Sequence, residues 1–339
     1  MRYGILALLL LGGCATKTSG AADGGAPADL ADGVAADLSD AVTADLAGSA
    51  APKWVRESGD GIFFDVWGAS ATDVYAVGTG GNVSGYIYHS PGAAVWTQIK
   101  GTGPLYAVWG SGADDVYVAG LDMILHSTDR GATWKSETLP AVSGSWLFDA
   151  LWGSGAGDVY VAGFSTDSSG TKTGSSILHS SGSGTWTVQY GSSSNGSSFS
   201  LWGADAAHVF AVDRSSGAVV RSSGNGAWTA NGALGPARRI WGLAATQLYV
   251  TAANGIAFGS SDGVTWTPST VTGAGSEFLE DICGSASDDL FIVGNQGSIF
   301  HRSASGWSKE GAAGARLNAL WRSGADLFAA GADGVYHRR

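Results

Sequence analysis

The chain has 339 residues, of which 54 are Gly, 14 are Trp and only 14% are charged, and its formal net charge is −11. This composition favours one large all-β domain and is poor in helix-forming residues. Nucleic acid is a poor partner for such an acidic chain, because binding to phosphates depends on clustered Lys and Arg.

Residues 1–13 predict a secretory signal peptide, since Arg2 precedes a short apolar run that is too short to span a bilayer as a mature helix. Cys14 directly follows Leu-Gly-Gly, which resembles the bacterial lipobox. The resemblance implies cleavage before Cys14, lipidation of its thiol and acylation of its new amino group. An ordinary signal peptide with an incidental cysteine is the alternative. By analogy, Ala15 after the cysteine favours the outer membrane, facing the periplasm or the cell surface.

Residues 14–50 predict a tether rich in Ala and Asp behind the lipidated Cys14. Apolar residues recur there every four positions, so a helix docked on another surface is one interpretation, but Gly33 and the many Asp residues favour a flexible spacer. A flexible coil of this length reaches roughly 30–35 Å. We therefore expect the following domain to stand off the membrane.

Residues 51–339 contain seven copies of one segment, exemplified by VWGSGADDVYVAG, with a period of about 40 residues. The copies begin at Val66, Val108, Leu151, Leu201, Ile240, Ile282 and Leu320. Each copy carries four short strand signals separated by Gly-rich turns. The pattern predicts an all-β, seven-bladed β-propeller of four-stranded antiparallel blades.

The last copy ends one strand short, at His337, whereas a surplus strand signal with a Trp stands before the first copy, around Trp54. We therefore expect the N-terminal strand to complete the last blade and close the ring, which leaves no open sheet edge.

Repeated side chains are expected to build the scaffold rather than a site. The tryptophans should pack blade against blade, and Cys283, which replaces one of them, should be a small buried residue. The histidines that recur on the third strand are interpreted as packing and hydrogen bonding between blades, not as metal ligands, because equivalent positions are spread around a ring.

The turn from Ser127 to Trp134 resembles the Asp-box, Ser-x-Asp-x-Gly-x-Thr-Trp, and the turn from Ser260 to Trp266 is a copy shortened by one residue. Asp-box propellers include sialidases, sortilin-type receptors and photosystem II assembly factors. The resemblance implies a propeller, with Asp129 and Asp262 as structural turn residues, and very little about activity. A sialidase needs clustered arginines, an acid and a Tyr nucleophile, and this chain departs from that pattern.

The connections that vary in length are those between the second and third strands and those between blades, and both emerge on one face, here called the loop face. The first-to-second and third-to-fourth strand turns are nearly constant, and they form the opposite turn face. Variable loops on a fixed scaffold favour a binding role; tolerated insertions without function are the alternative.

A candidate ligand face lies at the mouth of the axial channel on the loop face, three residues before each repeated Trp or its replacement. Its members are Phe64, Tyr106, Asp149, Phe199, Arg238, Glu280 and Asn318. Aromatic and charged side chains together suit a peptide, a protein loop or a glycan. The alternative is that these side chains merely fill the channel mouth and bind no ligand.

The sequence thus predicts a monomeric lipoprotein, attached to the membrane by its lipid anchor alone, that binds or scaffolds an envelope protein or a saccharide without catalysis. It predicts no catalytic residues, cofactor or metal site. A glycoside hydrolase or lyase acting on envelope or extracellular polysaccharide is the alternative, and a body that mainly fills space is a third interpretation.

Overall fold

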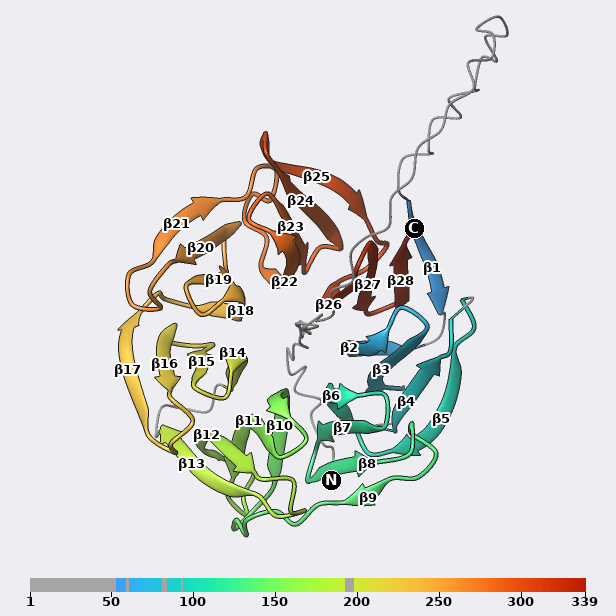
Figure 1. Cartoon of the computed structure of the whole chain (residues 1–339), viewed down its shortest axis with the longest axis vertical. Coiled ribbons are helices and arrows are strands. Elements are labelled where there is room, and N and C mark those ends of the chain that lie inside the picture. The colour runs from blue at the N-terminus through green and yellow to red at the C-terminus, as the bar shows by residue number, and fades with distance from the viewer. Residues whose placement is uncertain (1–52, 59–60, 81–83, 93, 193–197) are drawn as a thin grey trace, which may run out of the picture.

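A computed structural model describes residues 53–58, 61–80, 84–92, 94–192 and 198–339. Within these ranges the chain forms seven four-stranded antiparallel sheets arranged around an axis (Figure 1). The predicted seven-bladed propeller is therefore confirmed. The expected signal peptide, Cys14 and the tether lie outside the described residues.

The strands follow the repeat from the inside of the ring outward. Blade 1 holds β2 (Ile62–Ser70), β3 (Asp73–Thr79), β4 (Gly85–Ser90) and β5 (Thr97–Thr102); blade 2 holds β6 (Leu105–Gly112), β7 (Asp115–Gly120), β8 (Met123–Ser127) and β9 (Lys135–Ser136). Blade 3 holds β10 (Trp146–Gly155), β11 (Asp158–Thr166), β12 (Lys172–Ser180) and β13 (Thr187–Ser192); blade 4 holds β14 (Phe199–Asp205), β15 (His208–Asp213), β16 (Ala218–Ser222) and β17 (Trp228–Ala233). Blade 5 holds β18 (Ala237–Ala244), β19 (Gln247–Ala252), β20 (Ile256–Ser260) and β21 (Thr267–Thr270); blade 6 holds β22 (Leu279–Ala286), β23 (Asp289–Gly294), β24 (Ser298–Ser303) and β25 (Gly306–Ala312). Blade 7 holds β26 (Leu317–Ser323), β27 (Asp326–Gly331), β28 (Gly334–Arg338) and, from the other end of the chain, β1 (Trp54–Ser58).

The ring closes as the sequence predicts. In blade 7 the sheet order is β1-β28-β27-β26, and β1 runs antiparallel to β28 with Trp54 opposite Arg338. Because β1 covers the outer edge of β28, the backbone groups of that edge are paired.

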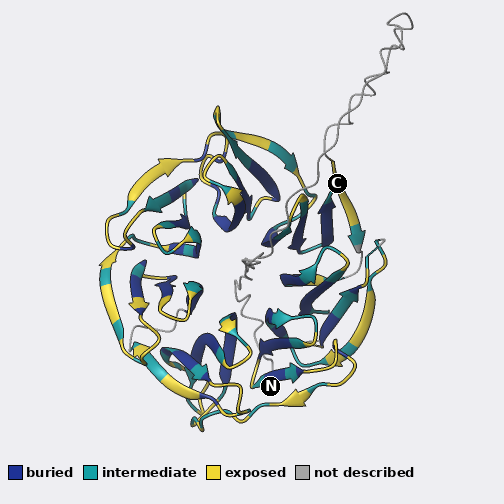
Figure 2. Ribbon diagram, viewed as in Figure 1, coloured by how far each residue is buried: buried dark blue, intermediate teal, exposed yellow. Residues whose placement is uncertain are grey.

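The core lies between the blades, where the inner three strands of each sheet are mostly buried and the outermost strands are exposed (Figure 2). Each repeated Trp-Gly pair has a steric basis. The ring of Trp67 lies over Gly110 of the next blade, where an added Cβ would come within 2.6 Å of it, and Trp109 lies over Gly153 in the same way at 2.5 Å. A glycine therefore makes room for the neighbouring indole.

Blade 6 departs from this pattern together with blade 7. In blade 6, Cys283 replaces the tryptophan and is fully buried. In blade 7, Arg322 replaces the glycine that follows the tryptophan. The Arg322 guanidinium lies 2.7 Å from Asp289 and 5.9 Å from the ring centroid of Phe291. The smaller side chain in one blade thus leaves room for the larger one in the next.

Buried polar side chains also join neighbouring inner strands. Asp65 accepts hydrogen bonds from Val66 N and, across the blade boundary, from Val108 N, each at 2.9 Å. Asp281 bridges blades 6 and 7 in the same manner through Leu320 N at 2.8 Å. Such pairing satisfies backbone donors that would otherwise be buried without a partner.

The repeated histidines act mainly within a blade rather than between blades, which corrects the expectation from the sequence. His126 Nε2 lies 2.7 Å from Asp115 on the adjacent strand, and its ring stacks on Tyr117 with a centroid distance of 3.8 Å. Further links between blades come from residues on or next to the outer strands, since Trp54 Nε1 donates to Glu310 at 3.0 Å and Trp96 Nε1 donates to Glu57 at 3.2 Å.

The two Asp-box-like turns are held by their own side chains. Asp129 accepts hydrogen bonds from Thr133 N and from the Ser127 hydroxyl, both at 2.8 Å. Asp262 accepts from Val264 N at 2.8 Å and from Thr265 N at 2.7 Å. In these positions both aspartates organise tight turns on the turn face.

Candidate functional site

The candidate ligand face coincides with a set of β-bulges. In six inner strands the hydrogen-bond register skips one residue near the start of the strand. The skipped residues are Phe64, Tyr106, Asp149, Arg238, Glu280 and Asn318. A bulge re-aims the side chain that it carries, so six of the seven candidates share one irregular backbone position at the channel mouth.

Phe199 is the exception. It pairs in regular register with Asp213, as Phe63 pairs with Gly78, and it is 1% exposed. Its ring packs against Tyr190 at a centroid distance of 5.7 Å. Blade 4 therefore lacks the bulge residue, and Phe199 belongs to the core instead of the mouth.

Blades 3 to 7 contribute a cluster of paired charges. Arg214, in the connection after β15, lies 2.7 Å from Asp149, which also accepts a short hydrogen bond from the Ser198 hydroxyl. Glu280 lies 2.8 Å from Arg316 and 4.0 Å from Arg238. The carboxylates of Asp149 and Glu280 are thus each held by arginines.

A second ion pair lies deeper, where Arg239 approaches Asp281 at 3.2 Å and both side chains are at most 2% exposed. Counting this pair, four arginines face three carboxylates here, and Lys172 adds a further cation in contact with the Phe164 ring. Within this cluster the cationic side chains therefore outnumber the carboxylates, in a chain that is acidic as a whole.

The arginines, not the acids, meet the solvent. The side chains of Arg238 and Arg316 are 18% and 19% exposed, whereas Glu280 is 1% exposed. Burial lowers the pKa of both guanidinium groups and raises the pKa of Glu280, and the attraction between these charges opposes both shifts. Because arginine stays protonated in proteins, an approaching ligand encounters positive charge.

Blades 1 to 3 contribute an apolar side to the same mouth. Phe64 and Tyr106 meet edge to face with their ring centroids 5.1 Å apart, and both pack against Leu147 and Phe164. Burial, together with the nearby Asp149 charge, raises the pKa of Tyr106, so its hydroxyl stays protonated. The mouth thus combines an aromatic half with a cationic half.

The turn-face end of the channel is chemically different. A cavity of about 860 Å³ opens there, lined mainly by Gly, Ala and Ser of the first turns and by the repeated tryptophans. Arg322 and Asp205 are its charged residues. This end carries small, repeated side chains, in contrast to the varied residues of the loop face.

Sequence reasoning missed the arginines that complete the mouth. Arg214 and Arg316 lie in connections between strands, not at a repeated position, so comparing the copies does not single them out. A usable signal would have been the presence of basic residues in the variable connections of a chain with few of them.

Two further features are absent from the described part of the chain. No group of three or more His, Cys, Asp or Glu side chains in those ranges is placed to hold a metal ion. None of the described segments forms a helix that is long and apolar enough to span a membrane.

Comparison with solved structures places the chain among β-propellers. YCF48 bound to a D1 peptide superposes with a TM-score of 0.63 at 14% identity, covering 85% of this chain and 94% of that one; YCF48 from Cyanidioschyzon merolae gives 0.60 at 18%, covering 84% and 98%. Virginiamycin B lyase from Staphylococcus aureus gives 0.64 at 14%, covering 85% and 98%. No family model matches the chain, and no curated protein does. At these identities the likeness shows the fold alone.

Proposed function

We propose that this protein is a lipid-anchored envelope protein whose propeller binds a peptide segment of another envelope protein at the loop-face mouth, without catalysis. The observation that carries the proposal is the presence at one mouth of the partly exposed Arg238 and Arg316 and of the aromatic pair Phe64 and Tyr106. A peptide that offers an acidic group next to an aromatic or aliphatic side chain fits both halves.

The comparisons are compatible with this use of the fold, since one of the similar propellers is described as bound to a peptide. The pairing of Asp149 and Glu280 with arginines also disfavours the glycosidase alternative, which needs one carboxyl to act as an acid and a second one free to act as a nucleophile or base. A saccharide stays as the second ligand class, because partly exposed aromatic rings such as those of Phe64 and Tyr106 also stack on sugars.

The binding test uses the full-length protein in detergent and fluorescent ten-residue peptides that differ in net charge and aromatic content. We expect acidic, aromatic peptides to bind best, with affinity that falls as salt rises. Arg238→Gln with Arg316→Gln should weaken binding at least about tenfold. Arg221→Gln, an exposed arginine on β16, is the matched control.

Equal binding by the parent and the double variant would refute the proposed mouth. If no peptide binds and envelope polysaccharide does, the saccharide class takes its place; release of sugar fragments would instead support the hydrolase or lyase.

The anchor is a separate part of the proposal and rests on the lipobox resemblance at Cys14. Metabolic labelling with an alkyne fatty acid should label the parent, and Cys14→Ser should remain unlabelled and lose membrane attachment. Cell fractionation of the parent would place it in the outer membrane, and protease treatment of intact cells would distinguish the periplasmic from the surface side. Labelling that persists in Cys14→Ser would contradict the assignment.

A further inference from the structure

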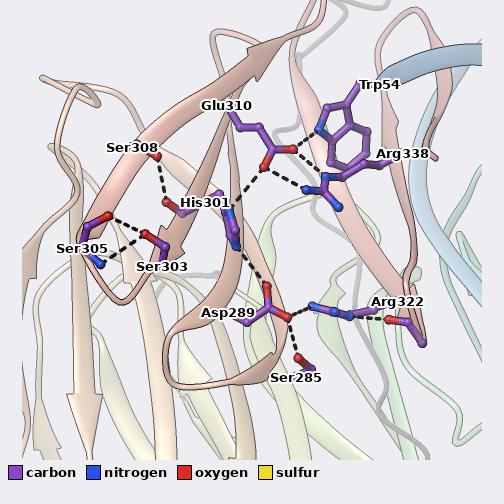
Figure 3. A network of polar contacts seen from close by, with 11 residues as sticks. Trp54, Ser285, Asp289, His301, Ser303, Ser305, Ser308, Glu310, Arg322 and Arg338 are labelled. Carbon is purple, nitrogen blue, oxygen red and sulfur yellow. Dashed lines mark hydrogen bonds and ion pairs between the residues drawn. The ribbon is translucent and has the colours of Figure 1, made fainter. Parts of the chain in front are cut away.

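The outer rim of the ring carries a five-residue network that is complete between blades 6 and 7. His301 stacks on Phe291 with a centroid distance of 4.2 Å, and its Nδ1 lies 3.3 Å from Glu310. From blade 7, Arg338 Nε donates to Glu310 at 2.6 Å and Trp54 Nε1 donates to it at 3.0 Å (Figure 3). One imidazole and one carboxylate of blade 6 thus meet an arginine and an indole of the next blade.

Between blades 5 and 6 the same network lacks both its imidazole and its carboxylate. Gly259 pairs with Tyr249 as His301 pairs with Phe291. Glu310 is the residue that a bulge in β25 skips, whereas β21 has no bulge, and Ser269 pairs with Ala257 as Gly311 pairs with Ile299. A Cβ added at Gly259 would meet no atom within 4 Å, so the space of the missing histidine is open.

A cavity of about 410 Å³ occupies this place, and Tyr249, Gly259, Ser269, Arg302 and Trp307 all line it. Arg302 follows the repeated histidine of blade 6 as Arg338 follows that of blade 7, and Trp307 corresponds to Trp54. The arginine and the indole of the network are therefore present at this boundary, while the imidazole and the carboxylate are absent.

The remaining polar groups lack partners in the described part of the chain. Trp307 Nε1 is shielded from solvent and makes no hydrogen bond there, and Arg302 forms no ion pair with any described residue, whereas Arg338 pairs with Glu310. The indole N–H groups of Trp186, Trp202, Trp228, Trp241 and Trp266 are also unpaired among the described residues. Trp307 combines an unpaired N–H with an arginine that lines the same cavity.

We propose that the cavity between blades 5 and 6 binds a small aromatic carboxylate. Its ring would stack on Tyr249 where the histidine of other blades lies, and its carboxylate would accept hydrogen bonds from Arg302 and from Trp307 Nε1. In blade 6 the imidazole and the carboxylate lie within 3.3 Å of each other, so a ring with its carboxylate one or two carbon atoms away has suitable dimensions. This site is distinct from the peptide-binding mouth and does not depend on it.

The test measures binding of phenylacetate and imidazole-4-acetate to the full-length protein in detergent by titration calorimetry and ligand-observed NMR. Acetate, which lacks the ring, and phenylacetamide, which lacks the charge, are the comparison probes. We expect both aromatic acids to bind at least about tenfold more tightly than either comparison probe. Arg302→Gln should weaken their binding at least about tenfold, and Arg221→Gln should leave it unchanged.

A second variant fills the site from within. Gly259→His with Ser269→Glu places an imidazole and a carboxylate in the cavity, which both residues line, so it should abolish binding. The proposal is overturned if the parent binds neither aromatic acid up to about 10 mM, if acetate binds equally well, or if Arg302→Gln binds as tightly as the parent. Unchanged binding by a folded Gly259→His, Ser269→Glu variant would overturn it too.

Discussion

Trp54 Nε1 donates a hydrogen bond to Glu310 Oε1 at 3.0 Å, which joins residues 256 positions apart in the chain (Figure 3). The contact connects β1, the first described strand, to blade 6, while the backbone of β1 completes blade 7. The start of the propeller is thus tied to two blades formed by the end of the chain.

Removing this contact tests the closure of the ring. Trp54→Phe keeps an aromatic ring but leaves Glu310 without one donor, so it should lower the free energy of unfolding by about 1–2 kcal/mol in urea titrations. Trp266→Phe is the matched control, because the Trp266 indole N–H has no partner among the described residues and should cost less. Equal losses would mean that the hydrogen bond adds nothing to stability.

Deleting residues 54–58 is the stronger test of closure. Without β1 the edge of β28 is left unpaired, and an open edge promotes association with other strands. We expect a lower melting temperature and concentration-dependent aggregation by light scattering. A truncated protein as stable and monomeric as the parent would show that β1 is dispensable.

His126 predicts a pH dependence of stability. Burial disfavours its charged form, but hydrogen bonds and charge attraction from Asp115 and Glu137 outweigh burial and raise its pKa to about 9 from 6.5. Since the folded state binds this proton more tightly, the contribution is fully present below pH 6.5 and is lost as the pH rises through 9.

The measurement compares the parent with His126→Gln by urea unfolding at about pH 6 and about pH 10, where the difference in stability should be about 1–3 kcal/mol larger at the lower pH. His208→Gln serves as the control, because His208 is 52% exposed beside Asp205, and its effect should change little. A difference for His126→Gln that stays constant with pH would contradict the assignment.

The ring was predictable from the sequence because its cause is repeated. Five Trp-Gly pairs mark inner strands that pack under the preceding indole, and together with the Cys283 and Trp321 copies they fix seven blades. The closure was predictable for a similar reason, since one strand was missing at the end and one was in surplus at the start. The repeated histidines were placed on the right strand, but which neighbour each one contacts depends on side-chain geometry that spacing does not reveal.

The mouth was predictable only in part. Taking the residue three positions before each repeated tryptophan finds a mouth residue only where the inner strand carries the bulge. Six blades have that bulge and blade 4 does not, so the count reached a core residue at Phe199. Hydrogen-bond register decides this, and a side-chain pattern does not display it. Arg214 and Arg316 were missed since they lie in connections where the residue type differs from blade to blade.

Asp65 tests how inner strands are joined. Both of its carboxylate oxygens accept backbone N–H groups, and the residue is 1% exposed. Asp65→Ala should leave Val66 N and Val108 N buried without this partner and cost about 2–4 kcal/mol in chemical unfolding. Asp205→Ala, which removes an exposed acceptor for Ala207 N, should cost less than about 1 kcal/mol. Similar costs at both sites would show that the bridge between blades is unimportant.

Cys283 and Arg322 predict a coupled pair of substitutions. At five blade boundaries an indole lies over a glycine of the next blade, whereas here a small buried thiol precedes a blade with Arg322 at the glycine position. Cys283→Trp alone forces an indole against the arginine and should destabilise the protein by about 1–3 kcal/mol. Arg322→Gly alone should also destabilise it, because it removes the ion pair with Asp289 at 2.7 Å and leaves empty space.

The double variant restores the arrangement of the other blades and should therefore be more stable than the sum of the single losses predicts. Two residues in contact commonly show interaction energies of about 0.5–3 kcal/mol in such a cycle. Thermal and urea unfolding of the four proteins gives this energy directly. Additive losses would mean that Cys283 and Arg322 occupy independent spaces. The presence of a cysteine in place of the tryptophan and of an arginine in place of the glycine would then need separate physical causes.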